Sequence, residues 1–164
     1  MFLRILSFMV IATSVFAASS AQAETVRINS ASTTSWELPN VVDQALNSLR
    51  SAPGERHELL LEGRFKPSAT IQLRWFTETP LTVTAVADSE AVLDGDALPK
   101  GKETVFIAGR NITLKGVHFV NSQGHAVIVG GRSDRYAIKE CSFEDCWQSA
   151  IHVWNDPHTI VADT

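Results

Sequence analysis

Residues 112–119, ITLKGVHF, return 24 positions later as residues 136–143, YAIKECSF. In the first segment the apolar residues Ile112 and Leu114 stand at even positions, and the next apolar residues, Val117 and Phe119, stand at odd positions. The second segment shows the same change from even to odd positions. In a flat strand this slip of one residue would turn the second pair away from the core. We therefore expect the chain to turn a corner near Gly116 and again near Glu140, which keeps both pairs inside.

The repeat extends beyond these two segments. An offset of 24 also places residues 126–129 on residues 150–153, whereas Gly109 and Gly131 are 22 apart, so a two-residue insertion is expected near Ser133. A period of about 20 to 30 residues, with strands and no helix inside the unit, is typical of a stacked β-solenoid.

Further strands are expected where short runs rich in Val, Ile, Leu and Thr are bounded by Gly, Asp, Asn or Pro. These runs are residues 25–28, 58–61, 70–74, 81–86, 91–93, 104–107, 111–119, 126–129, 136–143 and 150–154.

One segment has the period of a helix instead. Pro39 suits its first turn, and Pro53 and Gly54 end it. Its apolar stripe recurs every 3.6 residues and should face a core; the stripe comprises Leu38, Val41, Val42, Ala45, Leu46 and Leu49.

These coils resemble those of right-handed parallel β-helix proteins of the pectate-lyase-like superfamily. Their repeat has an apolar pair, a polar turn, an apolar-x-Phe step and a short third strand, as in residues 111–119 and 136–146. The segments ELLLEGRF (58–65) and AVLDG (91–95) after the helix are similar to the first coils of polysaccharide-lyase-type members. The resemblance spans roughly residues 38–155. It implies an all-β, right-handed parallel β-helix whose N-terminal amphipathic helix caps the first coil.

Residues 1–23 are typical of a secretory signal peptide. Arg4 precedes an apolar run that is too short for a membrane span, and Ala21 and Ala23 supply the small-x-small cleavage pattern. We therefore expect a secreted or periplasmic protein.

The mature part divides into residues 24–55, with the first strand and capping helix, and residues 56–164, with the coils. At about 24 residues per coil the second part holds between four and five coils. Relatives are usually longer, so C-terminal coils are expected to be missing. The chain is then an N-terminal fragment of a longer β-helix, or a short form that associates end to end.

The charge argues against nucleic acid as a partner. Without Arg4, 13 basic residues stand against 18 acidic ones, a formal charge of −5, and no segment is dominated by Lys and Arg.

Lys115 and Lys139 occupy the same place in successive coils and should stack on one outer face, about 4.8 Å apart. With Arg110, Arg132 and Arg135 near the neighbouring turns they form a local basic patch. This patch is either a solvated face or a groove for the carboxylates of a uronic acid polymer.

His152 and Trp154 form a second candidate site, with Asp156 and His158 nearby. As metal ligands these residues are loosely spaced and lack a fourth member, so no metal site is predicted. An exposed indole beside polar groups could instead stack on a sugar ring. The alternative is a polar turn after an exposed strand.

Cys141 and Cys146 are the only cysteines. An exported protein permits a disulfide between them. Alternatively Cys141, which takes the inward position of Val117 one coil earlier, is a buried apolar side chain.

The resemblance implies a polysaccharide lyase more than a glycoside hydrolase. Lyase chemistry needs a base at the carbon alpha to the sugar carboxylate, and Ca²⁺ or Arg to neutralise that carboxylate. No residue matches a family catalytic motif, so catalytic residues are not assigned, and Ca²⁺ is expected only for a lyase. The alternatives are a non-catalytic surface module that binds glycans or only packs, and a truncated chain without activity.

Overall fold

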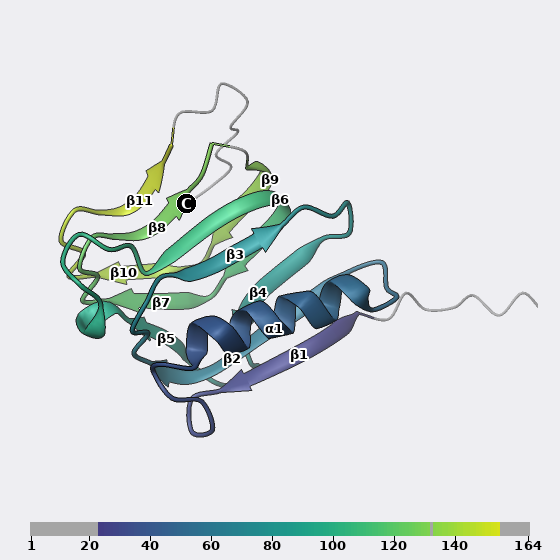
Figure 1. Ribbon diagram of the computed structural model, residues 1–164, viewed down its shortest axis with the longest axis horizontal. Coiled ribbons are helices and arrows are strands. Elements are labelled where there is room, and N and C mark those ends of the chain that lie inside the picture. The colour runs from purple at the N-terminus through teal and green to yellow at the C-terminus, as the bar shows by residue number, and fades with distance from the viewer. Residues whose placement is uncertain (1–22, 132, 155–164) are drawn as a thin grey trace, which may run out of the picture.

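The computed structural model describes residues 23–131 and 133–154 (Figure 1). This part of the chain contains one α-helix, α1 (Leu38–Ser51), and a short 3₁₀ turn, η1 (Gly95–Ala97). Its strands are β1 (Glu24–Asn29), β2 (His57–Phe65), β3 (Ile71–Trp75), β4 (Leu81–Ala85), β5 (Ala91–Asp94), β6 (Val105–Lys115), β7 (Val117–Val120), β8 (His125–Val129), β9 (Asp134–Lys139), β10 (Ser142–Glu144) and β11 (Ser149–Val153).

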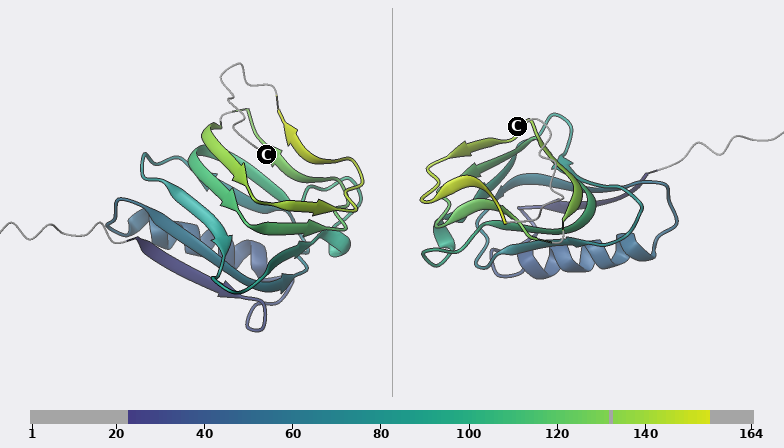
Figure 2. Two further views of the ribbon diagram at one scale, coloured as in Figure 1. Left: turned by 180° about the vertical axis from the view of Figure 1, so that it is seen from behind. Right: turned by 90° about the horizontal axis from the view of Figure 1, so that it is seen from above.

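All the strand pairs are parallel, and together they form one curled sheet with the shape of a half-barrel (Figure 2). The strands lie in three stacks, because β2 and β6 bend and each pairs in two of them. Stack A is β1–β2–β4–β6–β9, stack B is β2–β5–β7–β10, and stack C is β3–β6–β8–β11. The prediction of a mostly β fold with one helix is confirmed.

The register reproduces the repeat. Tyr136 pairs with Ile112 in stack A and Phe143 with Phe119 in stack B, both at the expected offset of 24. In stack C, Val129 pairs with Ile107 at an offset of 22, so the two extra residues follow Val129 as expected.

The chain also turns its corners at the two places where the apolar residues change between even and odd positions, as predicted. Gly116 separates β6 from β7 with φ +64°, and Glu140 separates β9 from β10 with φ +54°. These left-handed conformations bend the chain between stack A and stack B. The boundaries of two strands differ clearly from the expectation. Residues 104–107 and 111–119 are not separate strands, since β6 runs unbroken from Val105 to Lys115. The strand expected at residues 58–61 runs on to Phe65, because its last residues pair with β5 in stack B.

The inward residues of successive strands stack on one another to form the core. In stack A the row is Leu59, Val83, Leu114 and Ile138, all at most 5% exposed. In stack B the Phe119 ring lies on that of Phe143, with centroids 5.2 Å apart and planes 11° apart. Each strand therefore extends the same apolar interior.

The helix packs against β1, β2 and β3, beside the first strands of the sheet (Figure 1). Five residues of its predicted stripe are buried and Val41 is half-buried, so the predicted apolar face is confirmed. Within the described ranges, no helix has the length and apolarity that crossing a membrane requires. The predicted signal peptide lies, except for Ala23, outside the described residues, as do residues 155–164.

Candidate functional site

Lys115 and Lys139 are neighbours on the outer face of stack A. They are register partners on β6 and β9, and both are exposed because the residue before each, Leu114 or Ile138, points into the core. Lys115 Nζ lies 3.4 Å from Glu140 Oε2, so one of the two charges is already paired. Lys139 forms no ion pair with any other residue that the structure describes.

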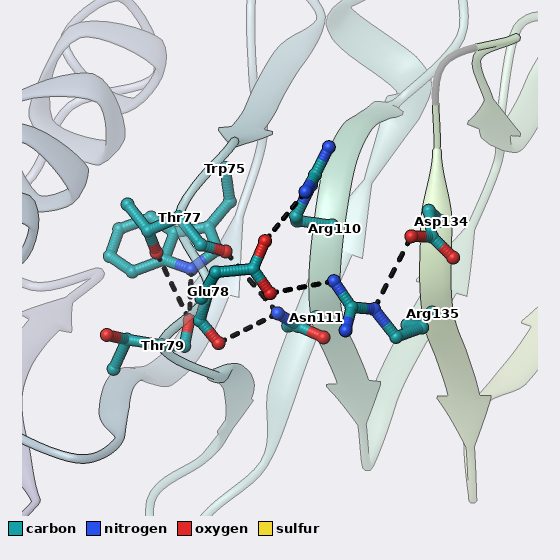
Figure 3. A network of polar contacts seen from close by, with 8 residues as sticks. All are labelled: Trp75, Thr77, Glu78, Thr79, Arg110, Asn111, Asp134 and Arg135. Atoms are coloured by element: carbon teal, nitrogen blue, oxygen red, sulfur yellow. Dashed lines mark hydrogen bonds and ion pairs between the residues drawn. The ribbon is translucent and has the colours of Figure 1, made fainter.

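One carboxylate holds two arginines of the predicted patch, Arg110 in the middle of β6 and Arg135 near the start of β9 (Figure 3). Arg110 Nη1 is 2.7 Å from Glu78 Oε1, and Arg135 Nη2 is 2.9 Å from Glu78 Oε2. Arg135 Nε also lies 3.4 Å from Asp134. Hydrogen bonds from Arg110 and Arg135 hold the pKa of Glu78 below its usual value.

We call the contacts of Glu78 with Arg110 and Arg135 the Glu78 clamp. The clamp fixes the loop between β3 and β4 to β6 and β9. Asn111 Nδ2 donates to the Glu78 carbonyl at 2.8 Å, and Trp75 Nε1 donates to the Thr79 carbonyl at 2.7 Å (Figure 3). Two of the predicted basic-patch residues therefore brace a loop. Arg132, which belonged to the same prediction, lies outside the described residues.

His152 and Trp154 lie on a different face, the outer side of stack C. Phe106 pairs with Ile128, and Ile128 with His152. The neighbours of Phe106 and Ile128 in their strands are buried, and those of His152 are partly buried against the core. Trp154 is 60% exposed, and its backbone N–H donates to the Val129 carbonyl at 2.9 Å. The direction of Trp154, which the sequence left open, is therefore outward.

The His152 ring stacks on His125, with centroids 4.5 Å apart and planes 21° apart. His125 Nδ1 is 2.7 Å from Ser149 Oγ. Burial, and then the nearby His152, lower the pKa of His125, so its ring is neutral at pH 7 and offers a flat surface.

Two hollows open beside the same face and share Gln72, which pairs with Phe106. One, of about 280 Å³, lies between α1 and β3 and is lined by Pro39, Asn40, Asp43, Gln72 and Arg74. The other, of about 350 Å³, is lined by Ser68, Ala69, Thr70, Gln72, Pro99, Lys102 and Glu103. We call these hollows, with Phe106, Ile128, His152 and Trp154, the stack C surface.

Sequence reasoning missed the hollows because their linings come from three distant segments without a shared motif. The pairing of the strands shows how these segments are connected. Gln72, Phe106, Ile128 and His152 form one row across four parallel strands, about 14 Å long at 4.8 Å per strand.

A buried carboxylate organises the end of stack B. Asp94 is 1% exposed, and its Oδ2 accepts from Arg64 Nη2 at 2.7 Å and lies 3.6 Å from Lys66 Nζ. Its Oδ1 accepts from Asn121 Nδ2 at 3.0 Å and from the Asp96 N–H at 3.2 Å. Burial raises the pKa of Asp94, but these hydrogen bonds outweigh burial and hold the pKa below its usual 3.8.

We expect Asp94→Asn to lower the free energy of unfolding by about 1.5–3 kcal/mol at pH 7, because hydrogen bonds to a charged group are lost. The pKa of Asp94 is lower in the folded state than in the unfolded state. Its stabilisation is therefore complete well above pH 3.8 and disappears as the pH falls through the folded-state pKa. Urea unfolding at several pH values measures the free energy of unfolding.

Asp96→Asn, at a side chain 63% exposed, is the control and should change the free energy of unfolding by less than about 0.5 kcal/mol. Equal losses at pH 7 would contradict the account.

Cys141 and Cys146 are free thiols and half-buried. Burial raises the pKa of both, which makes them poor nucleophiles near neutral pH. Ser142 and Phe143 pair with His118 and Phe119, which puts Cys141 beside Val117 as expected. Cys141 is only partly buried against the core.

In residues 23–131 and 133–154, no three His, Cys, Asp or Glu side chains are grouped so that they could hold a metal ion. Asp156 and His158 lie outside the described residues.

Comparison with protein-family models, with curated proteins and with solved structures gives no match to this chain.

Proposed function

We propose that this is an exported parallel β-helix protein, of the pectate-lyase-like kind, that binds uronic acid polymers such as pectate or alginate through the stack C surface. The observation that carries the proposal is the continuous row from the Gln72 hollows to His152, ending beside the exposed Trp154.

The chemistry of this surface suits a polysaccharide. Indole and imidazole rings stack on the apolar C–H faces of sugars, while amides, hydroxyls and carboxylates bond their hydroxyl groups. Arg74 and Lys102 form no ion pair within the described chain, so both are available to sugar carboxylates. The row also crosses several strands, as a polymer of linked rings requires.

Support for the β-helix comes from the way the chain visits the stacks. Four times it runs through stack A, then B, then C. These circuits are β2 and β3; β4, β5 and the first half of β6; the second half of β6, β7 and β8; and β9, β10 and β11. Each later circuit lies in parallel register on the preceding one. Export is proposed from the signal-peptide pattern of residues 1–23.

We propose binding without turnover. A lyase base must stand beside a cation that is available to the sugar carboxylate. Arg74 and Lys102 supply cations at the stack C surface, but no residue of the sequence matches a family catalytic motif that would supply the base. End-to-end self-association through the outer edge of β9, β10 and β11 stays a prediction.

We expect Trp154→Ala to weaken binding of pectate about ten-fold, because the exposed indole is the largest aromatic surface of the proposed site. Trp147→Ala is the matched control, because Trp147 is 66% exposed but lies in the turn between β10 and β11. Affinity electrophoresis or calorimetry with pectate, alginate and a neutral glucan measures the preference.

Two further variants separate the alternatives. If Lys115→Glu with Lys139→Glu abolishes binding and Trp154→Ala does not, the stack A face is the site and the stack C proposal is wrong. Release of unsaturated products absorbing in the near ultraviolet would identify a lyase and contradict binding without turnover.

A further inference from the structure

A third hollow lies outside the stack C surface, between the turn after β1 and the end of β2. Its volume is about 320 Å³, and its lining is mainly polar: Ser30, Thr33, Thr34, Ser35, Leu38, Arg64, Phe65 and Lys66. The hollow thus presents two cations opposite a row of hydroxyl-bearing residues.

The two cations are held in place from behind. Asp94 Oδ2 accepts from Arg64 Nε and Nη2 at 3.1 and 2.7 Å and lies 3.6 Å from Lys66 Nζ. The Asp94 side chain is only 2% exposed, whereas those of Arg64 and Lys66 are 54% and 50% exposed. A ligand in the hollow therefore meets the cations and not the carboxylate that positions them.

One buried carboxylate cannot neutralise two cations. The second partner of Lys66 is Asp96, 3.5 Å away and 63% exposed. Surface ion pairs of this kind contribute little, about 0–1 kcal/mol, so an incoming anion can displace Asp96. Arg64 keeps Nη1 and Lys66 keeps further N–H donors for that anion, because Asp94 takes only Nε and Nη2 of the guanidinium.

The opposite wall is a turn fixed by its own hydrogen bonds. Glu37 Oε2 accepts from Thr34 N–H at 3.1 Å and from Thr34 Oγ1 at 2.6 Å, and the Glu37 N–H donates to the Thr34 carbonyl at 3.1 Å. The Ser35 carbonyl accepts from Ser68 N–H at 3.2 Å, which ties the turn to the segment after β2.

This turn holds Trp36, which is 80% exposed, more than any other large apolar side chain in the described chain. Trp36 does not itself line the hollow, but Ser35 before it and Leu38 two positions after it do. The turn is already braced, so a ligand that contacts the indole has to order only that side chain.

We propose that this hollow is a subsite for one uronate residue, with the carboxylate on Arg64 and Lys66 and the C–H face of the sugar against Trp36. This inference rests on the proposed function and adds a second place, outside the stack C surface, at which acidic sugars are selected. A carboxylate suits the site because its two oxygens can accept charge-assisted hydrogen bonds from Arg64 Nη1 and from Lys66. An inorganic oxyanion would use the cations but not the indole.

The test is calorimetric titration of the full mature chain with trigalacturonate, a neutral glucose trimer and inorganic phosphate. We expect Trp36→Ala and Lys66→Gln each to weaken trigalacturonate binding about ten-fold, since one lost contact of this kind corresponds to about 1.4 kcal/mol. Lys66→Arg should retain most of the affinity, and Trp147→Ala should have no effect. Neither Trp36 nor Lys66 is buried, so the variants should fold, which circular dichroism checks.

The outcomes separate this inference from the proposed function. Trigalacturonate binding that falls with Trp154→Ala but not with Trp36→Ala or Lys66→Gln would overturn the subsite and leave the stack C surface. Binding that depends on Trp36 and Lys66 but not on Trp154 would support the subsite and overturn the stack C surface. Phosphate binding that depends on Lys66, with no effect of Trp36→Ala on trigalacturonate, would show an oxyanion site and contradict the uronate subsite. No binding of trigalacturonate by the unaltered chain would overturn both.

Discussion

Replacing Leu46 with Asp should leave the protein unable to fold at room temperature. Leu46 is 0% exposed and lies at the centre of the apolar face that α1 turns toward the sheet. Truncation of a buried leucine to alanine alone costs about 2–5 kcal/mol, and a buried unpaired carboxylate adds a larger penalty. The sum is comparable with the whole stability of an ordinary domain, about 5–15 kcal/mol.

Gln44→Asp is the matched control, since Gln44 lies in the same helix and is exposed. It introduces the same side chain and should change the free energy of unfolding by less than about 0.5 kcal/mol. Thermal and urea unfolding followed by circular dichroism measure both variants. A melting curve for Leu46→Asp equal to that of the unaltered protein would show that α1 is not part of the core.

Replacing Gly109 with Ala should have the second largest effect, a loss of more than about 3 kcal/mol. Gly109 pairs with Trp75 in stack C and has φ +123°, a conformation that residues with a Cβ rarely adopt. An added Cβ would lie 1.8 Å from the Trp75 carbonyl oxygen, so a backbone would have to move.

Gly116 provides the comparison because it also has a positive φ, +64°, but open space around it. The nearest atom to an added Cβ is Thr84 Oγ1 at 3.9 Å. Gly116→Ala should therefore cost only the left-handed conformation, about 1–2 kcal/mol. Urea unfolding of Gly109→Ala and Gly116→Ala measures the two losses of stability. Equal losses would mean that β3 and β6 do not approach each other as closely at Gly109 as the structure shows.

The repeat made much of this architecture predictable from sequence. Parity changes located the corners at Gly116 and Glu140, and self-alignment gave the register of Ile112 with Tyr136 because stacked strands bury equivalent side chains. The sequence did not indicate that β6 is one continuous strand. Gly109 and Asn111 look like loop residues, yet they bend the strand between stacks C and A without ending it.

The candidate sites were less predictable than the fold. Lys115 and Lys139 could be placed side by side from the repeat, but pairing of Lys115 with Glu140 depends on side-chain geometry. The Glu78 clamp joins residues 32 and 57 positions apart, outside the period of the coil. Trp36 and most of the residues that line the Gln72 hollows belong to α1 or to connections between strands, where the repeat carries no information.

The most direct test of the account is a nuclear magnetic resonance titration of the labelled mature chain with trigalacturonate. We predict the largest shifts at the Trp154 indole N–H, the Gln72 side-chain amide and the His152 ring, with the His118 ring on stack B unchanged. Shifts confined to the neighbours of Lys115 and Lys139 on stack A, or no shifts at millimolar ligand, would contradict it.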